Sequence, residues 1–183
     1  MDAADETISR ASRLLGCFHS EWDRFAAIRP VEGADVPQPY RTLLDHRSHM
    51  TVAMERHHGG PVRLRVVRVA NADEAGRYAR EILLEGPDGE IVQYGIVKLD
   101  LDAVDAGIAA AIRAADVPLG RLLIDSGMLR EVHRVRLFEV EPGADLGRLM
   151  GCGVRHTYGR VAEISLSGKP ALELLEIAAP QRS

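Results

Sequence analysis

The stretch YAREILLEGPDGEIVQYGIV, residues 78–97, decides the fold class of this chain of 183 residues. It consists of two apolar runs rich in β-prone side chains, Tyr78–Leu84 and Ile91–Val97, with Asp88 and Gly89 between them. An Asp-Gly pair between two such runs is typical of a tight hairpin turn, because both residues tolerate the positive φ angles that the turn requires. The stretch therefore predicts two antiparallel strands.

Further strands are predicted on either side of this hairpin. Residues 62–69 alternate apolar and basic side chains, which is the pattern of a half-buried strand, and residues 132–140 are also β-prone. Residues 158–166 and 170–179 lie on either side of a Ser-Gly turn and predict a second hairpin. Strands joined by tight turns pair antiparallel, so we expect an antiparallel sheet.

Apolar residues at helical spacing predict helices between these strands. We expect them at residues 7–27, 40–56, 102–115, 119–125 and 144–150, with a loop at 29–39, where prolines and a glycine gather. Hairpins separated by helical segments indicate an α+β fold, an antiparallel sheet with helices on one face. We expect one domain over residues 1–183, in which residues 1–39 form an N-terminal helical extension and loop.

The last predicted strand contains two carboxylates that an apolar strand does not need. Residues 170–179 are apolar on both faces and yet include Glu173 and Glu176. Side chains alternate along a strand, so positions three apart point to opposite faces of the sheet. Because both faces are apolar, the alternation leaves open which glutamate is buried.

Composition and charge exclude several classes of protein. The net charge is −4 and the isoelectric point is near 6.0, so the chain has no general attraction for nucleic acid or anionic membranes. Cys17 and Cys152 form no CxxC pattern, which argues against a disulfide framework. No targeting segment is evident, and no apolar run approaches the roughly 18 residues that span a bilayer. We expect a cytoplasmic protein with neither nucleic-acid nor membrane partners.

Two clusters invite a metal site. The spacing of the histidines matches no standard ligand framework, so a solvated helix end is the better explanation. The aspartates resemble a metal pair, but their alternate positions at a strand end beside a helix N-terminus, with the second as a candidate helix cap, explain them equally well. These residues are His46, His49, His57 and His58, and Asp100 and Asp102. We therefore expect no metal ion.

Four segments in order resemble the chorismate pyruvate-lyases, a family of single-domain enzymes with an antiparallel sheet. The resemblance covers about residues 40–180. Its segments are Ser48-His49-Met50-Thr51, Tyr78–Leu84 with the Asp88-Gly89 turn, Pro118-Leu119-Gly120-Arg121, and Tyr158-Gly159-Arg160 continuing through Ser167-Gly168-Lys169-Pro170 to Glu176 and Pro180. The resemblance implies a chorismate lyase-like fold in which helix-turn-helix flaps close an internal pocket.

The resemblance also implies four contacts with a bound molecule. Arg80 matches an essential pocket arginine, and Glu176 matches an essential glutamate, so both are candidate catalytic residues. Met50 and Leu119 match positions in the flap and wall that contact the ligand. Arg80 and Glu176 are also candidates to neutralise one another in the empty site, with a purely structural ion pair as the alternative.

The family's reaction converts chorismate to 4-hydroxybenzoate and pyruvate. Arginine's planar guanidinium suits a dianionic substrate, and a glutamate in an apolar pocket suits proton handling near neutral pH. Aromatisation drives the reaction, so the resemblance implies a carbon–oxygen lyase that needs no cofactor. Its partner would be a chorismate-type or aromatic acid, and the chain a monomer or small homo-oligomer.

One departure from the family pattern counts against chorismate. The family has an arginine where this chain has Ile96, after Gly95; Lys98, Arg121 and Arg160 are possible replacements for that charge. The alternative is a non-catalytic pocket for a small aromatic or carboxylic acid, as in related effector-sensing domains of transcription regulators. Those normally follow a DNA-binding segment, and about 39 residues before the resemblance are too few for one, which favours the enzyme.

Overall fold

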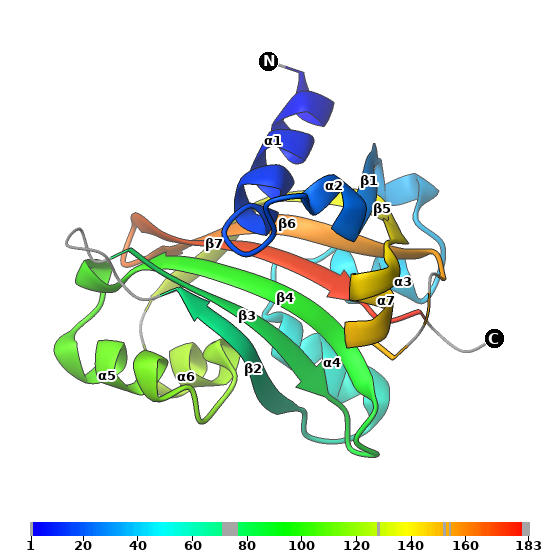
Figure 1. Cartoon of the computed structure of the whole chain (residues 1–183). Helices are drawn as coiled ribbons and strands as arrows, with labels where there is room; N and C mark the ends of the chain where they lie inside the picture. The colour runs from blue at the N-terminus through cyan, green and yellow to red at the C-terminus, as the bar shows by residue number, and fades with distance from the viewer. Residues whose placement is uncertain (1, 71–76, 128, 152, 154, 181–183) are drawn as a thin grey trace.

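A single antiparallel sheet of seven strands forms the centre of the computed structural model, which describes residues 2–70, 77–127, 129–151, 153 and 155–180 (Figure 1). The strands are β1 (Ala26–Val31), β2 (Arg63–Ala70), β3 (Arg77–Glu85), β4 (Ile91–Asp100), β5 (Arg130–Pro142), β6 (Thr157–Leu166) and β7 (Lys169–Ala178). Their order across the sheet is β1-β5-β6-β7-β4-β3-β2, and every neighbouring pair is antiparallel.

Both predicted hairpins are confirmed. Strands β3 and β4 pair directly, and Gly89 in their turn has φ +79°. Strands β6 and β7 also pair directly, and their turn places Ser167 at φ 49° and Gly168 at φ +80°. Glycine adopts such angles without steric cost, so the glycines at these positions correctly predicted the two turns.

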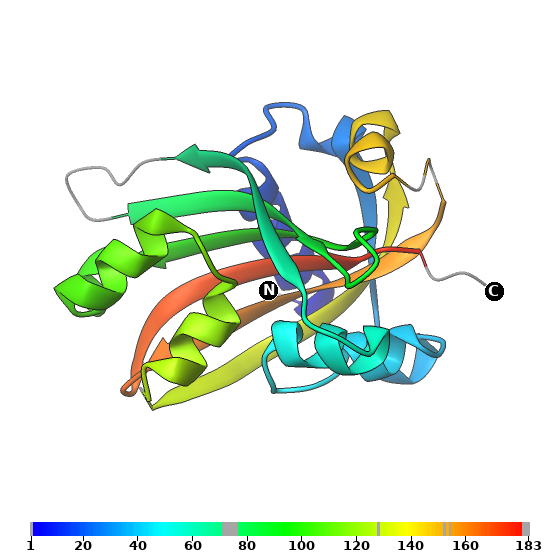
Figure 2. The ribbon, with the colours of Figure 1, turned by 90° about the horizontal axis from the view of Figure 1, so that it is seen from below.

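Helices cover both faces of the sheet. They are α1 (Ala3–Leu15), α2 (Trp22–Phe25), α3 (Tyr40–Leu44), α4 (Met50–His58), α5 (Ala106–Ala114), α6 (Leu119–Asp125) and α7 (Ala144–Leu149), with 3₁₀ turns η1 (Gly33–Asp35) and η2 (Leu101–Ala103). Helices α3 to α6 lie over one face of the sheet, while α1, α2 and α7 lie on the opposite side (Figures 1 and 2).

The predicted α+β class is confirmed, with helices on a second face in addition to the expected one. The central strands are apolar on both faces, so each face needs a covering layer. Ala11, Leu14 and Leu15 of α1 are buried against one face, where Leu175 of β7 also packs. The other face contributes two further clusters, one beneath α5 and α6 and one beneath α3 and α4.

The predicted helix over residues 7–27 is wrong beyond Leu15. Helix α1 ends there, and the chain turns before the short helix α2. A side chain in this turn explains the change of direction. The His19 ring stacks on Phe25 at 3.6 Å between ring centroids, and its Nε2 lies 2.7 Å from a carboxylate oxygen of buried Glu81. These contacts hold the segment after Leu15 against the sheet, so the chain turns there and α1 does not continue.

The predicted loop over residues 29–39 overlaps an edge strand. Strand β1 contains Pro30 and pairs only with β5 among the described strands. Proline lacks a backbone N–H, so it is tolerated in an edge strand, where one side of the backbone needs no partner. The prolines in this segment therefore led to the prediction of a loop where the chain forms an edge strand.

None of the helices among the described residues is long and apolar enough to cross a membrane. Cys17 is a half-buried free thiol, and Cys152 lies outside the described residues, so the prediction about a disulfide framework remains a prediction.

Candidate functional site

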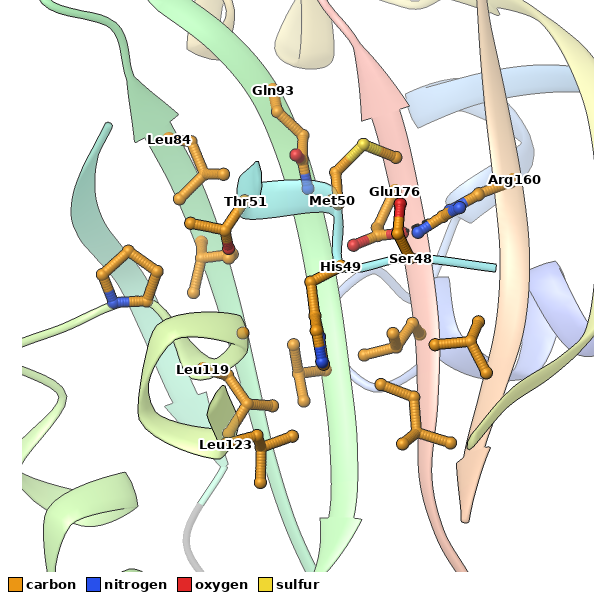
Figure 3. Close-up of a pocket in the computed structure, with 17 residues that line it drawn as sticks. Ser48, His49, Met50, Thr51, Leu84, Gln93, Leu119, Leu123, Arg160 and Glu176 are labelled. Carbon is orange, nitrogen blue, oxygen red and sulfur yellow. Dashed lines mark hydrogen bonds and ion pairs between the residues drawn. The ribbon is translucent and has the colours of Figure 1, made fainter. Parts of the chain in front are cut away.

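A small pocket lies between one face of the sheet and two helical segments. We call residues 40–58, with α3 and α4, the first flap, and residues 106–125, with α5 and α6, the second flap. Residues 48–51 of the first flap and 118–120 of the second approach each other over strands β3, β4, β6 and β7 (Figure 3). The flaps lie next to each other over this face of the sheet (Figure 2).

The pocket in this arrangement is small. Its cavity volume is about 50 Å³, room for a few water molecules. A cavity that holds benzene in an engineered protein is about 150 Å³. A ligand with an aromatic ring therefore requires the flaps to move apart.

Three contacts hold the two flaps together near the pocket entrance. Arg121 of α6 pairs with Glu55 of α4 at 2.5 Å between Nη2 and Oε2. Arg130, at the start of β5, bridges the flaps: it donates one hydrogen bond to Nε2 of His49 in the first flap and another to the main-chain oxygen of Leu123 in the second, at 3.2 Å. Gly120 of α6 packs closely on Thr51 of α4, with no room for a side chain between them. Opening the pocket has to break or shift these contacts.

Glu176 is buried beside an arginine, but the arginine is not the one predicted. It faces Arg160 on the adjacent strand β6, and Arg160 Nε donates to Glu176 Oε2 at 2.6 Å (Figure 3). The two side chains are 1% and 11% exposed, respectively. Arg160 Nη1 also donates to the main-chain oxygens of Leu44 at 3.1 Å and His46 at 2.9 Å. The expected neutralisation of Glu176 by Arg80 is therefore wrong.

Arg80 lies on the same face of the sheet, next to the pocket and beneath the second flap. Its residue is 1% exposed, and its cross-strand neighbour Val97 lines the pocket. Its Nη1 donates to the main-chain oxygen of Ile112 in α5 at 3.3 Å, while Nε and Nη2 have no hydrogen-bond partner among the described residues. Burial lowers the pKa of Arg80, and Tyr78 beside it acts in the opposite direction. A guanidinium nevertheless stays charged at neutral pH.

Three of the four predicted contact residues line the pocket together. Met50 is the first residue of α4, Leu119 is the first residue of α6, and Glu176 lies below them on β7 (Figure 3). Arg80 does not line the pocket. It lies on the same face of β3 as Ile82, which does line the pocket. Their roles as ligand contacts remain predictions.

Because side chains alternate along a strand, Glu173, Ile96 and Lys98 lie on the face of the sheet opposite the pocket. Glu173 pairs with Arg13 of α1 at 3.0 Å, so the two glutamates of β7 do face opposite ways. Ile96 is fully buried in the core beneath α1. Lys98 is the cross-strand neighbour of Glu173, and Arg121 pairs with Glu55. Of the three candidate replacement cations, Arg160 is the one that lines the pocket.

Two histidines of the first flap are held in the neutral form. His46 Nε2 lies 2.7 Å from the main-chain oxygen of Leu43 and must donate to it, while its Nδ1 accepts from the Ser48 N–H at 3.2 Å. Burial, reinforced by Arg160, lowers the pKa of His46. Burial and the Arg130 guanidinium likewise lower the pKa of His49, whose Nε2 accepts from Arg130.

Gln93 is buried on β4 and lines the pocket, although it was not among the site residues predicted from the sequence. The sequence signal that could have identified it is a glutamine in an otherwise apolar part of the strand, on the same side as Val97. Within the described ranges, no group of three or more His, Cys, Asp or Glu side chains is arranged to hold a metal ion.

Comparison with solved structures finds the same fold in distant proteins. PhnF from Mycobacterium smegmatis matches with a TM-score of 0.53 at 16% identity, over 72% of this chain and 64% of that one. The effector domain of PhnF matches with the same TM-score and identity, over 74% of this chain and 90% of the domain. Gene product SA0254 from Staphylococcus aureus matches with a TM-score of 0.50 at 8% identity, over 74% of this chain and 90% of that one.

This chain thus spans less than two thirds of PhnF but most of its effector domain. Neither a protein-family model nor a curated protein sequence matches the chain. The matches confirm the predicted chorismate lyase-like fold. They correct the predicted activity: the chain aligns with the effector domain of PhnF, and this finding overturns the assignment as a lyase that converts chorismate to hydroxybenzoate. The non-catalytic alternative agrees with the match.

Proposed function

We propose that this chain is a non-catalytic module that binds a small organic acid beneath the two flaps. The observation that supports this most directly is that Arg80 is buried with most of its guanidinium group lacking hydrogen bonds. Its side chain is buried and charged, and two of its three guanidinium nitrogens have no hydrogen-bond partner among the described residues. A carboxylate accepts two parallel hydrogen bonds from such a guanidinium edge, which makes an acid the natural ligand.

The energetics favour a ligand over a structural role for Arg80. A buried charge is expensive unless a counter-charge and hydrogen bonds compensate it. Within the described part of the chain, Arg80 has no carboxylate partner and makes one long hydrogen bond to Ile112, while the Tyr78 hydroxyl beside it also lacks a hydrogen-bond partner. The contrast with Arg160 is informative, because that equally buried arginine is paired with Glu176 and two main-chain oxygens.

The remaining lining suits the body of such an acid. Leu119 and Leu123 of α6 line the pocket together with Ile164 and Leu174 of the sheet, and these apolar side chains would enclose a planar ring or short hydrocarbon. Glu176 is already neutralised by Arg160, so the pair presents polarity without net charge. The fold likeness to the PhnF effector domain agrees with binding without turnover.

We also propose that one domain houses this site, with α1 as an integral part of it. Buried residues of α1 pack against the reverse side of the sheet, and Arg13 of α1 pairs with Glu173 of β7. Strand β7 therefore contacts α1 on one face and the pocket on the other. A change in the pocket floor can reach α1 through a single strand.

The test is binding of small aromatic and aliphatic acids, measured by calorimetry and by thermal unfolding. A ligand present at 100 times its Kd stabilises the protein by about 2.7 kcal/mol, a shift in Tm of roughly 5–10 °C. Arg80→Met should weaken binding about 10- to 150-fold, the worth of a charged hydrogen bond. Arg113→Met is the matched control, since it removes an exposed arginine from the same flap.

A second variant tests the location. Leu119→Trp fills the pocket from α6 and should abolish binding of an acid that the unaltered protein binds. The proposal fails if the acids that bind do so equally well to Arg80→Met and Leu119→Trp, or if no acid binds.

A further inference from the structure

A second buried polar group on the pocket side lacks a partner. Gln93 lies on β4, between Leu84 of β3 and Ala178 of β7 in the register of the sheet. Gln93 is 2% exposed and lines the pocket, and its Oε1 has no hydrogen-bond partner within the described ranges. Figure 3 shows the amide directed from β4 toward the space beside Met50.

An amide in this position works against the stability of the free protein. A buried acceptor that makes no hydrogen bond loses its hydration without compensation. Its neighbours in the lining include Leu84 and Met50, so an apolar side chain of the same size would pack there without this loss. The amide lies beside Gly95, the next residue on this face of β4, where an added Cβ would be 3.4 Å from Nε2, an ordinary packing distance. A polar group kept unsatisfied at a pocket wall is expected where a ligand completes it.

We infer that Gln93 recognises a hydrogen-bond donor, a hydroxyl or amino group, on the ligand. The inference rests on the proposed function and specifies the ligand further. Arg80 pairs with Val97 and Leu84 pairs with Gln93, so the two polar positions are four residues apart along the hairpin. At about 3.3 Å per residue along the strands and about 4.8 Å between adjacent strands, their backbones are separated by roughly 14 Å, and both side chains project from the same face. The ligand is therefore an acid with its carboxylate toward Arg80 and a donor group at its far end.

Such an arrangement gives specificity as well as affinity. A site built to hydrogen-bond a hydroxyl rejects an analogue that lacks it, because the buried acceptor then stays unpaired while water is excluded. A methoxy group in the same place has an oxygen of similar size but no hydrogen to donate. Gln93 should therefore select the hydroxyl compound over both the unsubstituted and the methoxy compounds.

Three acids of matched shape test this: phenylpropanoate, para-hydroxyphenylpropanoate and para-methoxyphenylpropanoate. Their Kd values are measured by calorimetry with the unaltered protein, with Gln93→Met, and with Leu83→Met as the control, since Leu83 is buried on the opposite face of β3, away from the pocket. The unaltered protein and Leu83→Met should prefer the hydroxy acid by about 10-fold or more, as one hydrogen bond in a buried site implies. Gln93→Met should lose this preference by binding the hydroxy acid more weakly.

Thermal unfolding of the free protein gives a readout that needs no ligand. Gln93→Met removes an unsatisfied acceptor and should raise the Tm by about 2–4 °C or leave it unchanged. A lower Tm would show that the amide is structural and would overturn the inference. Equal binding of the three acids by the unaltered protein, or a preference that persists in Gln93→Met, would overturn it too and leave the proposed function intact. Failure of all three acids to bind would count against both.

Discussion

Two arginines that are equally buried should respond in opposite ways to the same substitution. Arg80 and Arg160 are each 1% exposed. Arg160→Met removes the partner of Glu176 and leaves a carboxylate that is 11% exposed without a cation at 2.6 Å. Breaking a buried ion pair from one side typically costs about 3–5 kcal/mol. The main-chain oxygens of Leu44 and His46 lose their donor as well, so the first flap should loosen.

Arg80→Met should have little cost in the free protein. The substitution loses one hydrogen bond of 3.3 Å to Ile112, worth about 1 kcal/mol, and removes a buried charge with two unpartnered nitrogens. Relief of that charge should offset the lost bond, so we expect a change between neutral and about 2 kcal/mol of stabilisation. The two variants should therefore differ by at least about 3 kcal/mol, or roughly 6–12 °C in Tm.

Urea unfolding at neutral pH measures the difference directly. The midpoint should fall strongly for Arg160→Met and stay constant or rise for Arg80→Met, with similar m values for both. The double variant Arg160→Met/Glu176→Leu should recover most of the loss, because it replaces the whole ion pair with apolar side chains. Equal destabilisation by Arg80→Met and Arg160→Met, or strong coupling between Arg80 and Glu176 in a double-mutant cycle, would refute the reasoning.

Two further outcomes follow from the flaps. The folded protein holds the pKa of His46 and His49 below the unfolded value of about 6.5, so unfolding takes up protons and stability should fall as the pH drops below about 6.5. Urea midpoints at several pH values check this, and a flat profile in the unaltered protein would contradict it. Gly120→Ala places a Cβ 2.8 Å from Thr51 Oγ1 and should force α4 and α6 apart, at a net cost of about 1–2 kcal/mol after the gain in helix propensity. Faster hydrogen exchange in these two helices, with the strands unchanged, is the expected result; unchanged protection of the helices would show that the contact does not hold the flaps.

Local chemistry made much of the fold predictable. Gly89, Ser167 and Gly168 in the two turns have positive φ angles, which few residue types adopt readily, and so the turn sequences identified both hairpins without any knowledge of distant contacts. The second flap was also predictable, because the helix predicted at residues 119–125 has the bounds of α6. Pro118 immediately precedes it, a position where proline does not interrupt a helix.

Helix ends set by distant residues were not predictable. Helical spacing continues through residues 40–56, but the helix breaks between α3 and α4. In that break the main-chain oxygens of Leu44 and His46 accept hydrogen bonds from Arg160, a residue more than a hundred positions away. The end of α1 near His19 and Glu81 has the same kind of cause.

The sequence by itself determined the hairpins, the α+β class and the opposite orientations of Glu173 and Glu176, because turn propensities and strand alternation act over a few residues. Only the tertiary structure decided which arginine pairs with Glu176. Strand register placed Arg160 directly across from Glu176 and left Arg80 on β3, with β4 between it and β7. Charge pairing depends on distances of a few ångströms, and such distances follow from the order of the strands across the sheet.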